Sequence, residues 1–300
     1  MQMKQLLFAE EYNQHIPLFF SENNSGYVHS VFKNGLNIRM GNHLFFIGTT
    51  KNGQLPFGIH MDVQPIELLV SATNVDTPVV WQEETKELYL ENGLVINLEK
   101  GRSYSNKLNV VADSKGTMLQ HLETYLSLLA NYGEPTGLDV DIEQFIIDYA
   151  TEAAAPNENI DKLYTLMGAV FSDDEEKIDR ILRYFLGRGK GLTPSGDDHI
   201  VGLLAVHAVT GALHPVFIET AKKIIENESI TTDVAKEYLI YALQGELGSP
   251  VADVIDQLVQ KGSTNLENNM LKLLTMGHSS GVDTAFGILI GILAIQEANK

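Results

Sequence analysis

GRGKGLTPSGDD, residues Gly187 to Asp198, stands directly before a long apolar run, Ile200 to Val209, which predicts a buried helix. The stretch combines alternating glycines with two cations, two hydroxyls and two adjacent carboxylates. A helix N-terminus presents unpaired amides and the positive end of the helix dipole, and glycines let a ligand approach that backbone closely. We therefore predict an anion site here, with positive charge added by Arg188 and Lys190.

A capping box explains part of the same stretch. Ser195 precedes Asp198 by three residues at the start of the helix, so each side chain can bond the other residue's amide. Capping does not explain Gly191, Gly196 or Asp197, because glycine is a poor helix former and Asp197 has no part in the box. Structural and ligand-binding interpretations of this stretch both stay open.

A second copy of the pattern lies near the C-terminus. GHSSGVD, residues Gly277 to Asp283, precedes another apolar run, and the ten residues from Ser280 share five identities with the ten from Ser195. Gly202 and Gly287 each lie seven residues, two helical turns, after their serine. Small residues let helices cross closely, so we expect these two helices to pack together with their N-termini converging on one pocket.

Two sets of candidate residues follow from these motifs. His278 lies in the polar lead-in to the second helix, and its ordinary pKa suits proton transfer near neutral pH. His199 and His207 are eight residues apart, not the four typical of a metal pair, so we interpret them as packing residues or supports. The candidate catalytic residues are Asp197, Asp198, His278 and Asp283; the candidate ligand-binding residues are Arg188, Gly189, Lys190, Gly191, Thr193, Ser195, Gly196, Ser279, Ser280 and Gly281.

Composition excludes several classes of protein. The 300 residues are 44% apolar and 20% charged, as in a globular protein, and the absence of cysteine removes disulfides and thiolate chemistry. A net charge of −18 disfavours nucleic acid and anionic membranes. The first residues lack a signal-peptide pattern and no continuous run of apolar residues reaches 18, so we expect a cytoplasmic protein. Against that charge, four cations within eleven residues are informative: Arg180, Arg183, Arg188 and Lys190.

The hydrophobic pattern changes period along the chain. Short runs of branched and aromatic residues between 26 and 112 predict strands, with Asn92-Gly93 as a type I′ hairpin signal and antiparallel pairing. From about Thr117 the period is helical, beginning with a stripe that includes Met118 and ends before Gly133. We therefore predict an α+β protein: an antiparallel β-rich N-terminal domain, residues 1–115, and an all-helical domain, residues 116–300, that carries both Ser-Gly-x-Asp motifs.

Three helix starts show recognisable caps. Ser172 with Glu175 has the spacing of a capping box, and Ser249 stands before Pro250 at a first helical position. Thr232 is expected to cap a helix rather than to contact a ligand.

Both motifs resemble a known family. GLTPSGDD from Gly191 and GHSSGVDT from Gly277 resemble the bacterial family that includes AllH, a subunit associated with the oxamate carbamoyltransferase of allantoin breakdown in purine catabolism. The resemblance is dense from about 185 to 293 and includes Gly26 to Phe32. It implies a transferase that interconverts oxalurate and phosphate with oxamate and carbamoyl phosphate, acting with partner subunits. The Ser-Thr-x-Arg-Thr motif of aspartate and ornithine carbamoyltransferases is absent.

Two other functions remain as alternatives. Paired aspartates at helix starts are similar to the logic of ADP-ribosylglycohydrolases, which would imply a Mg²⁺-dependent hydrolase. The lack of an obvious nucleophile and base pair favours a non-catalytic ligand-binding subunit. Under the carbamoyltransferase interpretation, the ligand is a small anion such as phosphate, carbamoyl phosphate, oxamate or oxalurate.

Overall fold

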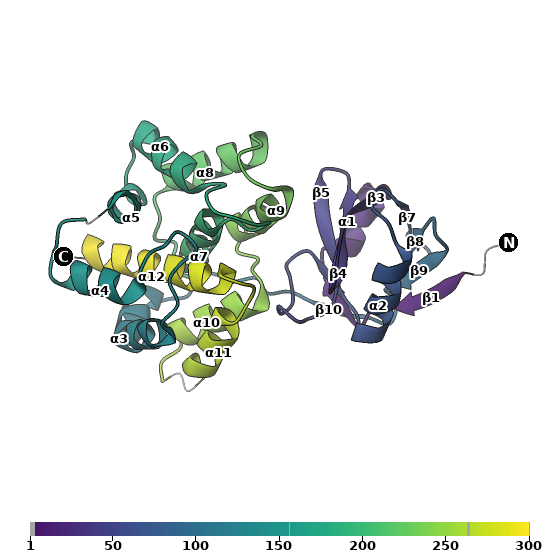
Figure 1. The fold of residues 1–300 in the computed structure, drawn as a ribbon, viewed down its shortest axis with the longest axis horizontal. Helices are drawn as coiled ribbons and strands as arrows, with labels where there is room; N and C mark the ends of the chain where they lie inside the picture. Colours follow the sequence, from purple (N-terminus) through teal and green to yellow (C-terminus); the bar gives the residue numbers. More distant parts are fainter. Residues whose placement is uncertain (1–3, 156, 263–264, 300) are drawn as a thin grey trace. The chain divides into compact units, whose positions relative to one another are not determined.

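The computed structural model describes residues 4–155, 157–262 and 265–299 and divides into two compact units, 1–106 and 107–300. The first unit carries the strands and the second is helical (Figure 1). The division falls before the predicted position at 115 because residues 107–113 bond to the helical unit. The Leu108 amide donates to the Gly245 carbonyl and the Val111 amide to the Val209 carbonyl.

The N-terminal unit is a ten-stranded sheet with two helices. Its order is β1-β9-β8-β7-β3-β4-β5-β6-β2-β10. Six of the nine neighbouring pairs in the described sheet are antiparallel, as predicted, but β1–β9, β10–β2 and β5–β6 are parallel. The strands are β1 (Gln5–Phe8), β2 (Glu11–Asn13), β3 (Ser25–Phe32), β4 (Gly35–Met40), β5 (His43–Gly48), β6 (Gly58–His60), β7 (Pro78–Gln82), β8 (Glu87–Leu90), β9 (Leu94–Asn97) and β10 (Arg102–Tyr104); the helices are α1 (Ile16–Glu22) and α2 (Val63–Ala72).

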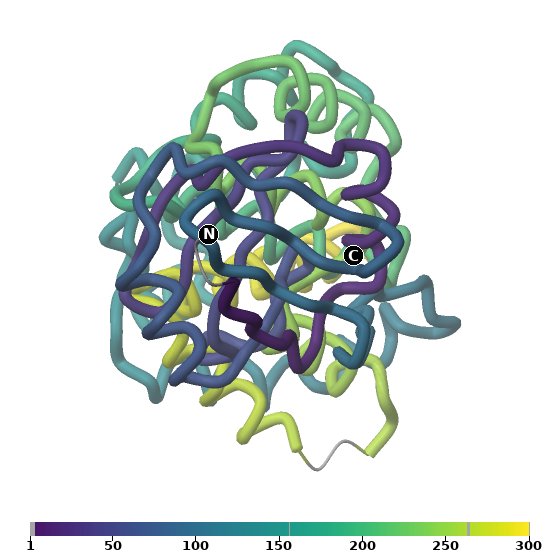
Figure 2. The backbone as a smooth tube through the Cα atoms, turned by 90° about the vertical axis from the view of Figure 1, so that its right-hand side faces the viewer, coloured from purple at the N-terminus to yellow at the C-terminus, as the bar shows by residue number. Residues whose placement is uncertain are grey.

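The sheet curls because its first two strands join opposite ends of the strand order. Only two residues separate β1 from β2, yet β1 pairs with β9 and β2 with β6 and β10. The Ala9 amide bonds the Asn97 carbonyl, while the Glu10 amide bonds the His60 carbonyl. Figure 2 shows the backbone of this unit as the purple and blue parts of the tube. The inner side chains of the curl form the core of the unit.

The predicted hairpin at Asn92-Gly93 is present, but its turn differs from type I′. The loop between β8 and β9 has three residues, and the Gly93 amide bonds the Leu90 carbonyl. Gly93 has a φ of 92°, whereas Asn92 is not among the residues with positive φ. A type I′ turn needs positive φ at both central residues, so this is a three-residue connection with glycine alone in the left-handed region.

The helical unit is built around two central helices, α7 and α12. Both are apolar on nearly every face, which is the pattern of a helix enclosed by others. The described helices of this unit are α3 (Ser114–Tyr132), α4 (Ile142–Ala150), α5 (Glu158–Ala169), α6 (Glu175–Phe185), α7 (Ser195–Thr210), α8 (Pro215–Asn227), α9 (Asp233–Leu243), α10 (Ser249–Val259), α11 (Leu266–Leu274) and α12 (Ser280–Ala298). Helix α12 is long and apolar enough to cross a membrane, but 83% of its most apolar window is buried, as in a core helix.

The helix caps agree only in part with the sequence. Thr232 caps α9 as predicted, because its hydroxyl accepts from the Ala235 amide. The predicted box at Ser172 is wrong: Asp174 caps α6, and the Ser172 hydroxyl accepts from the Asp174 amide instead. Helix α10 has Gly248 at its cap, so its serine and proline both lie inside the first turn.

Candidate functional site

Helices α7 and α12 cross at their glycines, as predicted. A Cβ built on Gly202 would lie 2.2 Å from the Thr284 carbonyl oxygen, and one on Gly287 would lie 2.2 Å from the His199 carbonyl oxygen. No side chain fits between the two backbones there. Because both glycines stand two turns after a serine, the close crossing also brings the two helix N-termini side by side.

The two motifs meet through hydroxyl groups. Thr193 Oγ1 and Ser280 Oγ are 2.8 Å apart, and the Ser280 hydroxyl bonds the carboxylate of Asp198. Since Ser280 has one proton to donate, Thr193 donates to Ser280 and Ser280 donates to Asp198. This relay connects the glycine loop, the start of α12 and the first turn of α7.

Gly137 marks the point on which the two motifs converge. A Cβ built on this exposed residue would lie 2.0 Å from Ser195 Oγ, 2.8 Å from Ser279 Oγ and 3.0 Å from Asp283 Oδ2. Its amide donates to Asp283 Oδ1 at 2.8 Å. The side chains of both helix starts therefore pack closely around one spot beside the loop between α3 and α4, where a residue with a Cβ would clash.

The glycine loop presents its backbone to solvent. Gly187, Gly189 and Gly191 all have positive φ, which other residues rarely adopt. Within the described chain, the amides of residues 189–193 and of Ser195 donate no hydrogen bond. Successive free amides in such a turn form a concave surface suited to an anion.

The capping box predicted at Ser195 and Asp198 is wrong. Helix α7 begins at Ser195 itself, with Pro194 at the cap position and no side-chain cap. The Gly196 amide donates to the Arg188 carbonyl instead, at 2.8 Å. The Ser195 hydroxyl is therefore available beside Gly137, which the capping interpretation would not allow.

Asp197 supports the loop rather than facing Gly137. Its Oδ1 accepts from the Gly187 amide at 2.9 Å, and its Oδ2 accepts from the Thr231 hydroxyl. Burial raises the pKa of Asp197 to about 6 although both hydrogen bonds lower it. The carboxylate thus fixes the start of the glycine loop against the segment before α9.

Asp198 and Asp283 are buried carboxyl groups that can each accept a further hydrogen bond. They are 7% and 0% exposed, and in each the Oδ2 atom is buried with no hydrogen-bond partner among the residues that the structure describes. Burial, followed by the charge of Asp283, raises the pKa of Asp198 well above its usual value. Buried oxygens without partners are costly, so this pair is suited to a ligand that donates hydrogen bonds.

His199 lies behind these two aspartates. Its Nδ1 donates to the Ser195 carbonyl at 2.5 Å and is 3.8 Å from Asp283 Oδ1. Burial lowers the pKa of His199, and its ring stacks on Phe185. The neutral imidazole therefore holds the first turn of α7 against α12, in agreement with its interpretation as a support. His207 accepts from the Leu213 amide, farther along α7.

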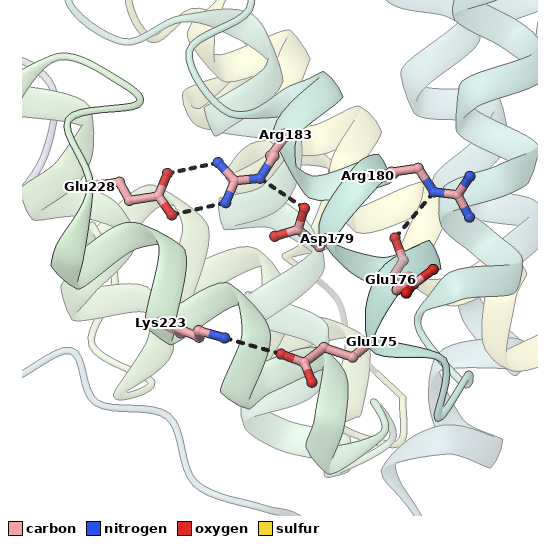
Figure 3. Close-up of polar contacts among 7 residues, drawn as sticks. All are labelled: Glu175, Glu176, Asp179, Arg180, Arg183, Lys223 and Glu228. Atoms are coloured by element: carbon pink, nitrogen blue, oxygen red, sulfur yellow. Dashed lines mark hydrogen bonds and ion pairs between the residues drawn. The ribbon is translucent and has the colours of Figure 1, made fainter.

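The four cations near the loop have different surroundings. Arg183 bonds both carboxylate oxygens of Glu228 and also Asp179 on its own helix (Figure 3). Arg180 donates to the Glu176 carbonyl. The guanidinium of Arg188 lies 4.0 Å from the centre of the Tyr184 ring, and Lys190 is exposed. The charge of Arg183 is thus paired with carboxylates, whereas Arg188 lies over an aromatic ring and Lys190 is exposed.

The surroundings of His278 differ from those of the buried carboxyl groups. It is exposed in the turn before α12, and it has no hydrogen bond to any described residue. The structure therefore brings Ser195, Ser279 and Asp283 together around Gly137 and links Ser280 to Asp198, with His278 at the surface of the preceding turn.

The acidic groups do not form an evident metal site. Among the described residues, no group of three or more histidines, aspartates and glutamates is placed to hold a metal ion. Divalent magnesium is held by several oxygen ligands in near-octahedral geometry.

Three contributors to the site were missed from the sequence. Gly137 lies in the loop after α3, and Thr231 directly precedes the cap residue Thr232. Tyr238 on α9 lies close enough to Asp198 that the carboxylate charge adds to burial in raising the pKa of the phenol. Glycine after proline in a loop is a weak signal, and the contact of Tyr238 has no sequence signal.

Two family models match the chain. One, described as oxamate carbamoyltransferase subunit AllH, matches residues 185–292, and the AllH family N-terminal domain matches residues 8–103. The chain belongs to the AllH family. The first match includes both motifs of the site, and the second extends well beyond the predicted resemblance at 26–32. No solved structure gives a significant match.

Proposed function

We propose that this AllH-family chain binds the substrate of an oxamate carbamoyltransferase at the paired starts of α7 and α12. The reaction would convert oxalurate and phosphate to oxamate and carbamoyl phosphate, in either direction. The observation that supports this is the convergence of Ser195, Ser279 and Asp283 on Gly137, beside a loop of free amides. Family membership supplies the reaction class.

The site has two ends of opposite preference. The amides of residues 189–193, with Arg188 and Lys190 nearby, favour a negatively charged group. The buried Oδ2 atom of Asp283, which accepts no hydrogen bond from the described residues, would attract an N–H group. Oxamate and oxalurate carry a carboxylate at one end and an NH₂ group at the other, so they match both ends in one orientation.

This polarity assigns roles in the transfer. A phosphate oxygen attacks the carbamoyl carbon of oxalurate, the bond from that carbon to the inner nitrogen breaks, and the nitrogen leaves with the electron pair and needs a proton. Asp198 supplies that proton, because its raised pKa keeps the carboxyl protonated at a higher pH than usual, and it regains a proton from the attacking hydrogenphosphate. Asp283 orients the NH₂ group, and Asp197 positions the loop. Partner subunits complete the enzyme.

Ligand binding to the isolated chain tests the two-ended site. Oxamate and pyruvate have nearly the same shape, but pyruvate has a methyl group in place of NH₂. We expect oxamate to raise the melting temperature, because a ligand at a hundred times its Kd adds about 2.7 kcal/mol to the free energy of unfolding. At the same concentration, pyruvate should raise the melting temperature much less. Phosphate and carbamoyl phosphate should also stabilise the protein. Equal effects of oxamate and pyruvate would refute recognition of NH₂ by the aspartates.

Two variants separate this site from general anion binding. Gly137→Ala places a methyl group 2.0 Å from Ser195 Oγ and should abolish the oxamate response, whereas Gly116→Ala has no neighbour within 4 Å and should keep it. Asp283→Asn should reduce the preference for oxamate over pyruvate. An unchanged response in Gly137→Ala would place the ligand elsewhere. Turnover by the chain alone would show that partner subunits are not required for catalysis.

A further inference from the structure

A pocket lies in the helical unit, at the C-terminal ends of α4, α5 and α12. It has a volume of about 880 Å³ and is enclosed by α3, α4, α5 and α12. Pockets for small molecules are typically about 300–1,000 Å³, so it can hold a compact organic molecule. None of the candidate residues around Gly137 lines it. The pocket is therefore separate from the proposed substrate site.

The lining is largely apolar. Leu122 and Leu126 of α3, Met167 of α5 and Leu293 of α12 contribute aliphatic surface, and Phe171 adds an aromatic ring just after α5. Leu122, Met167 and Leu293 are themselves packed into the core of the unit. The wall is thus preformed by core side chains, and an apolar group that enters it leaves water without reorganising the helices.

The charges at this pocket all have one sign. Asp148, Glu152 and Glu297 belong to the lining, and no lysine, arginine or histidine does among the described residues. Helices α4, α5 and α12 end here, at Ala150, Ala169 and Ala298. The C-terminal end of each helix dipole carries partial negative charge, which adds to the three carboxylates. A ligand with a negative group would be repelled.

Two tyrosines give the pocket polar and aromatic contacts. The Tyr149 hydroxyl donates to Glu297 Oε1 and holds that carboxylate at the pocket. The Tyr164 ring lies tilted against Phe145, with ring centres 5.9 Å apart, and its hydroxyl is buried with no hydrogen-bond partner among the described residues. Aromatic rings beside carboxylates are suited to an organic cation, because the ring faces attract positive charge.

We propose that this pocket binds a small organic amine, with its ammonium group among Asp148, Glu297 and the tyrosines and its apolar body against the aliphatic wall. The volume suits a molecule of this kind, and the sign of the charge selects an amine over a fatty acid or an aromatic acid. The proposal does not depend on the carbamoyltransferase function, because neither its residues nor its ligand are shared with the site at Gly137.

Calorimetric titration of the full chain with three matched probes tests this proposal. The probes are 3-phenylpropylamine, 3-phenylpropanol and 3-phenylpropionate, which share an apolar body and differ in charge. We expect the amine to bind at least about tenfold more tightly than the alcohol and the acid not to bind measurably, in keeping with ion-pair and cation–π contributions in a partly desolvated site. Equal affinity for the amine and the alcohol would overturn the assignment of a cation site.

Matched variants locate the binding. Ala150 is an exposed lining residue, so Ala150→Trp should fill the mouth and abolish amine binding, whereas Ala154→Trp, at an exposed position outside the lining, should not. Glu297→Gln should weaken amine binding several-fold, and Glu143→Gln, on α4 but outside this pocket, should leave it unchanged. Amine binding that survives Ala150→Trp, or that falls equally in Glu143→Gln, reflects general attraction to an acidic protein and overturns the proposal.

Discussion

Gly202 and Gly287 face each other's helices across the α7–α12 crossing, each 2.2 Å, measured from a built Cβ, from a carbonyl oxygen of the opposite helix. The crossing is the structural condition for the site, because it sets how closely Ser195 and Ser280 approach. A substitution here must move backbone rather than a flexible side chain. Its effect should therefore appear in stability and in ligand binding together.

Gly202→Ala should lower the free energy of unfolding of the helical unit by about 1–3 kcal/mol or more, the usual cost of overpacking. Helix propensity alone would favour alanine by about 1 kcal/mol, so the sign of the change reports the crossing. Urea denaturation followed by circular dichroism measures it. Gly116→Ala is the control, since its added methyl group has open space around it. A stabilised Gly202→Ala would contradict the close crossing.

The crossing could be predicted from sequence because its signal is local. Two apolar runs with glycine at the same place after the same motif are enough to suggest close packing. The convergence on Gly137 could not be predicted, because Gly137 meets Ser195 and Asp283 from positions 58 and 146 residues away, in a loop without any periodic pattern. Contacts of that kind are decided by the whole fold.

The sheet shows the same limit. The long strands in the middle of the order, such as β3 and β5, follow from runs of branched and aromatic residues. The curl depends on β1 and β2, which have four and three residues, and on their parallel pairing with distant strands. Helix α2 is not predicted from the sequence either. Its Pro65 lies in the first turn, where a helix tolerates proline, so this proline is no evidence for a loop.

Asp197→Asn should change how stability depends on pH. The carboxyl group ordinarily titrates at 3.8 and in the folded protein at about 6, so between these values the folded state binds more protons than the unfolded chain. The free energy of unfolding therefore falls as pH rises through this window, by about 3 kcal/mol for a shift of two pKa units.

The variant should lack that loss, because the amide does not titrate: its oxygen can still accept from the Gly187 amide, and its NH₂ group can donate to the Thr231 hydroxyl. Urea denaturation at pH 4.5 and pH 7 measures the difference: Asp197→Asn should gain stability relative to the natural chain at the higher pH. The same relative stability at both values would show that the pKa of Asp197 is not raised in the folded protein.

Asp198→Asn should raise the free energy of unfolding and weaken the response to oxamate. Burial and the neighbouring Asp283 raise the pKa of Asp198, so its charged form is destabilising above that pKa. We expect the variant to be more stable than the natural chain at pH 8, with a smaller difference at pH 5, and to respond less to oxamate. Asp139→Asn, at an exposed position in the loop before α4, serves as the control and should change neither property. A destabilised Asp198→Asn at pH 8 would indicate that the carboxylate is compensated in the fold.

Replacing the cations of α6 and of the glycine loop one at a time should affect phosphate binding to different extents. Arg183 already bonds Glu228 and Asp179, whereas Arg188 lies on the face of Tyr184 next to the free amides of the loop. We expect Arg188→Ala and Lys190→Ala each to weaken phosphate binding several-fold, and Arg183→Ala to leave it nearly unchanged. Titration at low and high salt measures both the affinity and its screening, and the loop variants should flatten the salt dependence. If Arg183→Ala weakens phosphate binding as much as Arg188→Ala, the anion is attracted by the general charge of this face, and the glycine loop is not its site.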